Sequence, residues 1–300
     1  MRSGTFQNLG GFGKLLLLLL VVFASFIIFS FLTFVAVLPF SDFSLVSGEG
    51  TMSLEILRIF QIVQSFSTFI LPALVAGFIF WGHYTRGIGF FRPAGMKIIL
   101  SFLVIISLQP VVSYLGIWNS QMHLPDAFQG VEQWMKNSEE SATDILFRFL
   151  DTDHAGLWML NFLMIVLLPA FGEEMLFRGA LQPIFQEWFR NKHVAVWITA
   201  FLFSAIHLQF FTFLPRFLLG IALGYLMLWG GNIWYPVAGH FANNSLSMIV
   251  FYYYRYSKPE MNPLEPGGEV LSPLWIIPGV VLTVSLFLSF YKRSSAKILP

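Results

Sequence analysis

The sequence predicts an all-α membrane protein, a polytopic transmembrane bundle of about eight helices. Of its 300 residues, 56% are hydrophobic and only 11% are charged, whereas soluble domains carry about 25% charged residues. The apolar runs are ~20 residues long, enough to cross a bilayer as helices, and they lack the alternation of barrel strands. We therefore expect a multi-pass integral membrane protein embedded in the lipid bilayer.

Each expected span is an apolar segment bounded by polar or basic residues. The first is expected to be a retained helix and not a signal peptide, because its apolar run exceeds the ~7–15 residues of a signal sequence and no small-residue cleavage site follows. Pro72 and Pro110 would kink the second and third spans. The expected spans cover residues 15–38, 57–81, 98–117, 157–189, 194–211, 213–229, 233–254 and 274–291.

The longest segment outside the spans covers residues 119–155 and is acidic. Apolar residues recur in it at helical spacing, among them Val131, Trp134 and Ile145. This pattern predicts an amphipathic helix lying on the membrane surface; the alternative is a lid over a substrate site. Two further segments are predicted as polar loops, at residues 41–55 and 258–272.

Basic residues gather on one side of this arrangement. Eight spans bring both termini to the same side, together with Arg2, Lys14, the 83–97 loop and the 190–193 turn. Positively charged loops stay in the cytoplasm, so both termini are predicted to be cytoplasmic. We divide the chain into an N-terminal region of three spans with the amphipathic loop, a core whose polar residues are described below, and a C-terminal loop with the last span and a basic tail: residues 1–154, 155–255 and 256–300.

The sequence also excludes several functions. The net charge is only +1 and no basic patch is present, so nucleic acid is not an expected partner. A nucleotide is not expected either, because no glycine-rich phosphate loop follows a strand. The absence of cysteine rules out disulfides, thiolate metal sites and a cysteine nucleophile. The motifs His-Glu-x-x-His and Gly-x-Ser-x-Gly of common hydrolases are absent as well.

Three charged residues interrupt the otherwise apolar fourth span: Glu173, Glu174 and Arg178. Each charge costs about 2.5–3.5 kcal/mol near the centre of a spanning helix. Glu174 and Arg178 stand four residues apart with the acid first, which is the favourable order for an ion pair within one helix. Glu173 is turned about 100° around the helix, so we expect its partners on other helices.

Two further polar pairs lie in later spans: Phe203 with His207, and His240 with Asn244. A lone histidine on an apolar helix face is more often a satisfied core residue than a catalytic one. Two histidines, a glutamate and an asparagine on neighbouring membrane helices indicate a functional site instead. Such residues could bind Zn²⁺ with an open position for water. They could also activate water without a metal and donate hydrogen bonds to an oxyanion.

The three motifs resemble those of the CPBP (Abi) intramembrane proteases, which include the type II CAAX prenyl endopeptidases and bacteriocin-processing enzymes. The family pattern is Glu-Glu-x-x-x-Arg, Phe-x-x-x-His and His-x-x-x-Asn, and it is matched here by residues 173–178, 203–207 and 240–244. The resemblance covers about residues 155–255. It implies an eight-helix bundle with a membrane-embedded catalytic cavity, and hydrolysis of a peptide bond in a membrane-associated peptide or protein.

The resemblance also implies catalytic roles. Glu173 and His207 would activate the attacking water, while His240 and Asn244 would stabilise the oxyanion. The cofactor stays open at this stage. Glu173, His207 and His240 would make a zinc site, and a metal-free glutamate mechanism is the alternative.

The remaining motif residues would support this site. Glu174 and Arg178 would form an ion pair, and Phe203 would pack beneath His207. The substrate could be a CAAX-type prenylated protein or a leader or bacteriocin peptide. Two other functions also stay open: a membrane transporter or proton relay that uses the same buried residues, and a non-catalytic scaffold.

Overall fold

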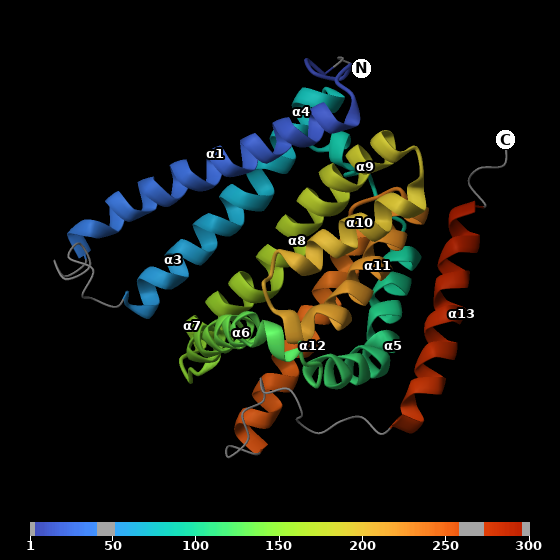
Figure 1. The fold of residues 1–300 in the computed structure, drawn as a ribbon. Helices are drawn as coiled ribbons and strands as arrows, with labels where there is room; N and C mark the ends of the chain where they lie inside the picture. The colour runs from blue at the N-terminus through green and yellow to red at the C-terminus, as the bar shows by residue number, and fades with distance from the viewer. Residues whose placement is uncertain (1–3, 41–51, 258–272, 296–300) are drawn as a thin grey trace. The chain divides into compact units, whose positions relative to one another are not determined.

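The computed structural model describes residues 4–40, 52–257 and 273–295. Within these residues all regular structure is helical and no strand occurs (Figure 1). The predicted all-α fold is therefore confirmed. Most of the predicted 41–55 loop, the whole 258–272 loop and Lys297 of the tail lie outside the described residues.

Six helical segments of the described chain are long and apolar enough to cross a membrane, and each falls on a predicted span: Gly11–Phe40, Leu54–Trp81, Gly95–Ser120, Ala155–Phe189, Phe210–Gly230 and Pro273–Ser294. The other two predicted spans are also helical. One is short, at 14 residues (α10, Lys192–Ala205), and the other is less apolar (α12, Trp234–Ser257), because residues such as His240 and Asn244 lower its hydropathy. These features fit a multi-pass membrane protein.

The chain folds into two compact units, each built from two stretches of sequence. Unit 1 comprises Met1–Gly89 and Arg148–Trp188, and unit 2 comprises Phe90–Phe147 and Phe189–Pro300. The acidic motif therefore belongs to unit 1, and both histidine motifs belong to unit 2.

Unit 1 contains α1 (Gly11–Val37) and two long helical runs that π-helical turns interrupt. The first run consists of α3 (Leu54–Ser65), a π turn at Phe66–Ile70 and α4 (Leu71–Trp81). The second consists of α7 (Ala155–Asn161), a π turn at Phe162–Leu167, α8 (Leu168–Glu174), a π turn at Met175–Leu181 and α9 (Gln182–Phe189). Helix α1 packs against α3 and α4.

Each of these π turns ends two residues before a proline, namely Pro72, Pro169 and Pro183. Proline has no N–H to donate to the carbonyl four residues earlier, and its ring clashes with that carbonyl. Widening the preceding turn into a π turn moves the carbonyl away from the ring. The prolines therefore account for where the helices of unit 1 widen.

Unit 2 is a bundle of more regular helices: α5 (Gly95–Ser120), most of α6 (Gln129–Leu150), α10, α11 (Phe213–Gly230), α12 and α13 (Ile276–Ser295). Helix α5 packs against α11, α12 and α13, and α10 packs against α11. The α10–α11 contact is close, because a Cβ atom added to Gly220 would lie 3.2 Å from Ala200 Cα. Small residues allow membrane helices to approach in this way.

Candidate functional site

The acidic motif lies in unit 1, where α8 meets the π turn Met175–Leu181. Arg178 Nη1 donates a hydrogen bond to Glu174 Oε1 at 2.9 Å, and both side chains have no exposed surface. Breaking such a pair would leave a charge uncompensated in a medium of low dielectric constant. The pair therefore ties these two residues to the stability of unit 1.

Glu173 is also buried, with 8% of its surface exposed. Two glycines flank the motif at close helix contacts. A Cβ atom at Gly172 would lie 3.1 Å from Phe69 Cβ, and one at Gly179 would lie 2.9 Å from Ile88 Cβ. These contacts press the motif helix against its neighbours in unit 1 and so fix the position of the acidic residues within that unit.

The first histidine motif lies at the end of α10 in unit 2. The predicted fifth span continues to residue 211, but α10 ends at Ala205 and His207 lies in the turn that follows. His207 Nδ1 is 2.7 Å from the carbonyl oxygen of Phe203. Because a carbonyl can only accept, Nδ1 carries a proton, and a neutral ring in this tautomer has its lone pair at Nε2.

The turn after α10 explains why the sequence prediction was wrong here. Leu208 has a φ angle of 53°, a left-handed conformation that is costly for leucine. No glycine or proline in the sequence indicates that the helix ends here. Tertiary contacts hold it: Ser204 Oγ donates to the Phe213 carbonyl at 2.7 Å, and Asn119 Nδ2 donates to the Phe210 carbonyl at 3.1 Å.

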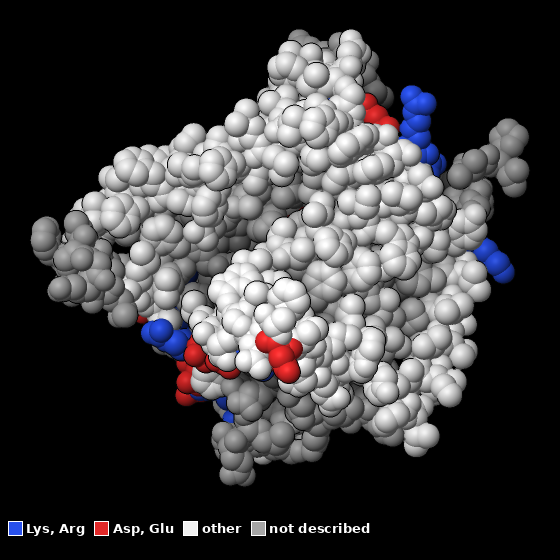
Figure 2. Space-filling model, viewed as in Figure 1, with Lys and Arg blue, Asp and Glu red and all other residues white. Residues whose placement is uncertain are grey.

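Helix α6 supports the same connection. Glu139 accepts hydrogen bonds from the Phe211 N–H at 2.9 Å and from the Thr212 hydroxyl at 3.0 Å. The Trp134 ring packs 5.5 Å from the Phe210 ring. The helix predicted within residues 119–155 is thus present. Figure 2 shows acidic side chains around it, while other charged side chains lie elsewhere on the same face. Its place on the membrane surface stays a prediction.

The second histidine motif lies on α12, and Phe203 joins it to the first. His240 is 6% exposed. The Phe203 ring centroid lies 5.2 Å from that of His207 and 5.8 Å from that of His240, edge-on in both cases. Unit 2 therefore brings these three residues together, from α10, the turn that follows it, and α12.

Asn244 follows one turn after His240 and belongs to a chain of amide hydrogen bonds. Its Oδ1 accepts from Asn243 Nδ2 at 3.2 Å, and Asn243 Oδ1 accepts from Gln109 Nε2 at 3.1 Å. Sequence reasoning missed Gln109 and Asn243. The available signals were a polar residue inside the third predicted span and an asparagine adjacent to the motif. Through these hydrogen bonds, Gln109 of α5 orients the amide of Asn244.

The seven predicted residues thus form two groups, each placed within its own unit. Glu173, Glu174 and Arg178 are the group of unit 1; Phe203, His207, His240 and Asn244 are the group of unit 2. In the described part of either unit taken alone, no three histidine, cysteine, aspartate or glutamate side chains come close enough to hold a metal ion.

Comparison with known proteins identifies the segment that carries the motifs. Residues 155–246 match the family model described as type II CAAX prenyl endopeptidase Rce1-like. This segment resembles the Rce1-like endopeptidases. The matched range contains all three motifs, so the resemblance predicted from the sequence is confirmed for this part of the chain.

A bacterial protein is similar in sequence to part of this chain. "Uncharacterized protein YpbD" of Bacillus subtilis (strain 168) is 32% identical over 85 residues, which are 27% of this chain and 40% of that protein. The chain therefore spans less than half the length of this curated relative. No solved structure matches the chain.

Proposed function

We propose that this protein is an intramembrane endopeptidase that hydrolyses a peptide bond of a membrane-associated peptide or protein. The observation that carries the proposal is the placement of His207 and His240 around Phe203 within a segment that matches the Rce1-like model. The buried Glu173 of the same segment is the carboxylate that we assign as the general base.

Glu173 and His207 activate the attacking water in this proposal. The Glu173 carboxylate takes a proton from the water as the water oxygen attacks the carbonyl carbon of the scissile bond. The same proton then passes to the leaving amine as the C–N bond breaks. His207 accepts a hydrogen bond from the water at Nε2, the nitrogen that has the lone pair while Nδ1 donates to Phe203.

His240 and Asn244 stabilise the oxyanion of the tetrahedral intermediate. They stand four residues apart on α12 and therefore project from one face of the helix. Each can donate an N–H to the developing negative charge, and loss of one such donor typically lowers kcat by about 10²–10³-fold. Gln109 and Asn243 act as positioning residues, because they hold the amide of Asn244 without reaching the reacting atoms.

The residue types of the proposed site are those that bind zinc, but the described residues contain no group of three histidine, cysteine, aspartate or glutamate side chains that could hold a metal ion. His207 and His240 offer imidazole nitrogens from around Phe203, and Glu173 offers a carboxylate, which is the His₂Glu composition of many catalytic zinc sites. A bound zinc ion would supply a Lewis acid that makes water more acidic. With or without it, the residues of the chain orient the water, move its proton and donate to the oxyanion.

A cleavage assay on the purified full chain tests the proposal. Glu173→Gln, His207→Ala, His240→Ala and Asn244→Ala are each expected to lower cleavage about 100-fold or more, with expression and thermal unfolding close to wild type. His154→Ala and Glu140→Gln change exposed residues of the same types and serve as matched controls. Wild-type rates in any of the four site variants would refute the role given to that residue.

The same assay distinguishes the substrate class and the metal. A panel of prenylated CAAX peptides, their unprenylated forms and leader peptides shows which chemistry is recognised. A chelator arm with zinc added back tests the cofactor, and activity that survives complete metal removal would eliminate the zinc mechanism.

The proposed topology places both termini in the cytoplasm, and the absence of cysteine makes this easy to test. Single cysteines introduced at Gln7, Ser138 and Ser289 can be labelled with an impermeant reagent in sealed vesicles. We expect Gln7 to be labelled from the cytoplasmic side and Ser138 from the opposite side, with the membrane-embedded Ser289 protected.

A further inference from the structure

Unit 2 contains an apolar groove between α11 and α13, and Leu108 of α5 also lines it. Its volume of about 550 Å³ falls within the ~300–1,000 Å³ of typical ligand pockets. Its walls are aliphatic and aromatic, and the hydroxyl of Thr283 is turned to a hydrogen-bonding partner, Ser107 Oγ, at 2.9 Å. None of the seven motif residues lines this groove.

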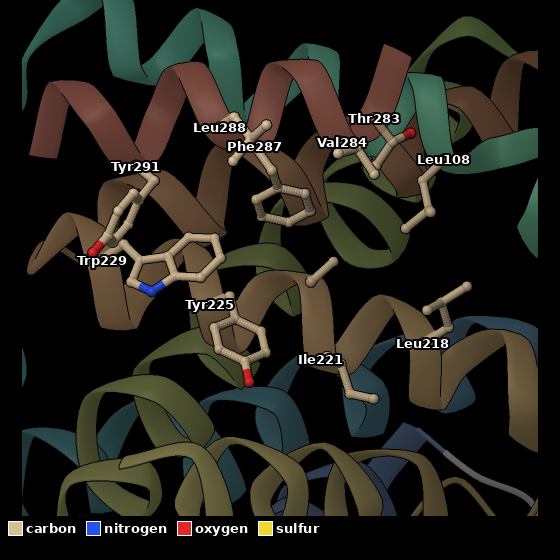
Figure 3. Close-up of a pocket in the computed structure, with 11 residues that line it drawn as sticks. Leu108, Leu218, Ile221, Tyr225, Trp229, Thr283, Val284, Phe287, Leu288 and Tyr291 are labelled. Atoms are coloured by element: carbon tan, nitrogen blue, oxygen red, sulfur yellow. The ribbon is translucent and has the colours of Figure 1, made fainter. Parts of the chain in front are cut away.

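The two ends of the groove differ in chemistry. Figure 3 shows Tyr225, Trp229 and Tyr291 at one end, and Leu108 and Leu218 at the other. The Trp229 and Tyr291 rings lie 5.3 Å apart, so this end is built of aromatic side chains that also carry polar atoms. Such residues mark the membrane–water interface. The groove therefore runs from the interface into the hydrocarbon.

The length of the groove matches one leaflet of a bilayer. Leu218 and Trp229 stand eleven residues apart on one helix, which is about 16 Å at 1.5 Å per residue. The hydrocarbon core of a bilayer is about 30 Å thick, so the groove covers about half of it. A single acyl chain has this reach.

A cation stands at the interfacial end. Lys292 follows Leu288 by four residues on α13 and therefore lies next to the edge of the face that lines the groove. Arg293 is turned about 100° further around the helix. Both α11 and α13 end on this side, and helix C-termini present partial negative charge. An anionic group at this end would therefore depend on the lysine and not on helix dipoles.

We propose that this groove binds an anionic phospholipid of the surrounding bilayer. One acyl chain fills the groove between α11 and α13, and the phosphate lies beside Lys292, near the polar atoms of Trp229 and Tyr291. The predicted topology places this end on the basic, cytoplasmic side, where anionic lipids attract lysine and arginine. The proposal is independent of the peptidase function, because it concerns a separate site.

Native mass spectrometry of the full chain, released from detergent with added lipid, tests the proposal. Phosphatidylglycerol and phosphatidylcholine with identical acyl chains are the two probes. We expect wild-type protein to retain phosphatidylglycerol preferentially. Lys292→Gln should weaken that binding about fivefold and leave phosphatidylcholine binding unchanged. Arg293→Gln, which removes the same charge from an adjacent exposed residue, should behave as wild type.

A second pair of variants tests the groove itself. Val284 lines it and is 51% exposed, whereas Leu282 is 53% exposed on the same helix and does not line it. Val284→Trp is expected to lower retention of both lipids, and Leu282→Trp to change neither. Equal binding of the two lipids by wild type, or full retention by Val284→Trp, would overturn the proposal. So would a dimer that Val284→Trp dissociates, because the groove would then be filled by a second copy of the chain.

Discussion

The two units of this protein place proline differently within their helices. In unit 1, Pro72, Pro169 and Pro183 interrupt long helical runs, and a π turn precedes each of them. In unit 2, Pro215, Pro236 and Pro278 are each the third residue of a helix, where the N–H has no partner within the helix and its loss costs little. Pro110, which lies inside α5, is an exception in unit 2. Proline therefore interrupts long helical runs in unit 1 and stands mostly at helix starts in unit 2.

The acidic and histidine motifs also differ in the contacts that hold their residues. In unit 1 the ion pair of Glu174 and Arg178 lies at a π turn with no exposed surface, so it is part of the packing. In unit 2, His207 lies beyond the end of α10, where its ring bonds to the carbonyl of Phe203 and packs against the ring of the same residue. We therefore expect substitutions of Glu174 and Arg178 to act mainly on stability, and substitutions of His207 and His240 to act mainly on activity.

Removing one member of the buried ion pair is the strongest test of this contrast. Arg178→Met is expected to destabilise the protein by about 3–5 kcal/mol, because Glu174 would remain charged in the apolar interior. The double variant Glu174→Leu with Arg178→Met should recover most of the loss. Thermal unfolding in detergent measures both, with His207→Ala as the comparison from unit 2. A double variant as unstable as the single one would contradict the explanation.

A glycine contact gives a smaller effect of the same kind. Gly179→Ala in unit 1 places a methyl group 2.9 Å from Ile88 Cβ and is expected to cost about 1–3 kcal/mol through overpacking. Gly130→Ala in α6 makes the same change where no atom lies within 4 Å. There the better helix propensity of alanine should leave stability unchanged or slightly raised. Equal unfolding temperatures for the two variants would contradict the close contact.

Much of this fold can be predicted from the sequence, because few structures can accommodate long apolar segments and buried charges in a membrane. The spans of α1, α5 and α11 follow from apolar length, and the spacing of Glu174 and Arg178 anticipates their contact. The end of α10 does not follow, since tertiary hydrogen bonds and the strained Leu208 fix it and no local residue does.

Two further features could not be predicted from the sequence, because they also depend on how the helices pack. A proline in a run of apolar residues indicates a distortion, but the choice between a kink and a π turn depends on how neighbouring helices pack. The amide chain through Gln109 and Asn243 joins residues far apart in sequence, and no spacing rule relates α5 to α12. The division of the motifs between two units is likewise a property of packing.

The amide chain offers a moderate test within unit 2. Asn243→Ala removes the hydrogen bond to Asn244, and a bond worth about 0.5–1.5 kcal/mol corresponds to roughly a 3–10-fold fall in kcat. A positioning role predicts an unchanged KM, and Gln109→Leu should give a similar effect. Ser247→Ala, on the exposed side of α12, is the control. A rise in KM with unchanged kcat would indicate substrate binding instead.

The smallest effect concerns an ion cluster at the start of α6. Glu132 accepts hydrogen bonds from His123 Nδ1 at 3.0 Å, Lys136 Nζ at 2.8 Å and the Leu124 N–H at 2.9 Å. The His123 bond, with those from Lys136 and Leu124, lowers the pKa of Glu132 from 4.5 to about 2. Because the pKa of Glu132 is lower in the folded state, this stabilisation is present above pH 4.5 and disappears as the pH falls towards 2.

Hydrogen exchange measures this effect. Exchange of residues 121–132 should be faster in Glu132→Gln than in wild type at pH 6, and the two rates should converge in acid. Glu140→Gln, an exposed site on the same helix, should match wild type throughout, and a Glu132→Gln profile identical to wild type at pH 6 would show that the cluster does not order this segment.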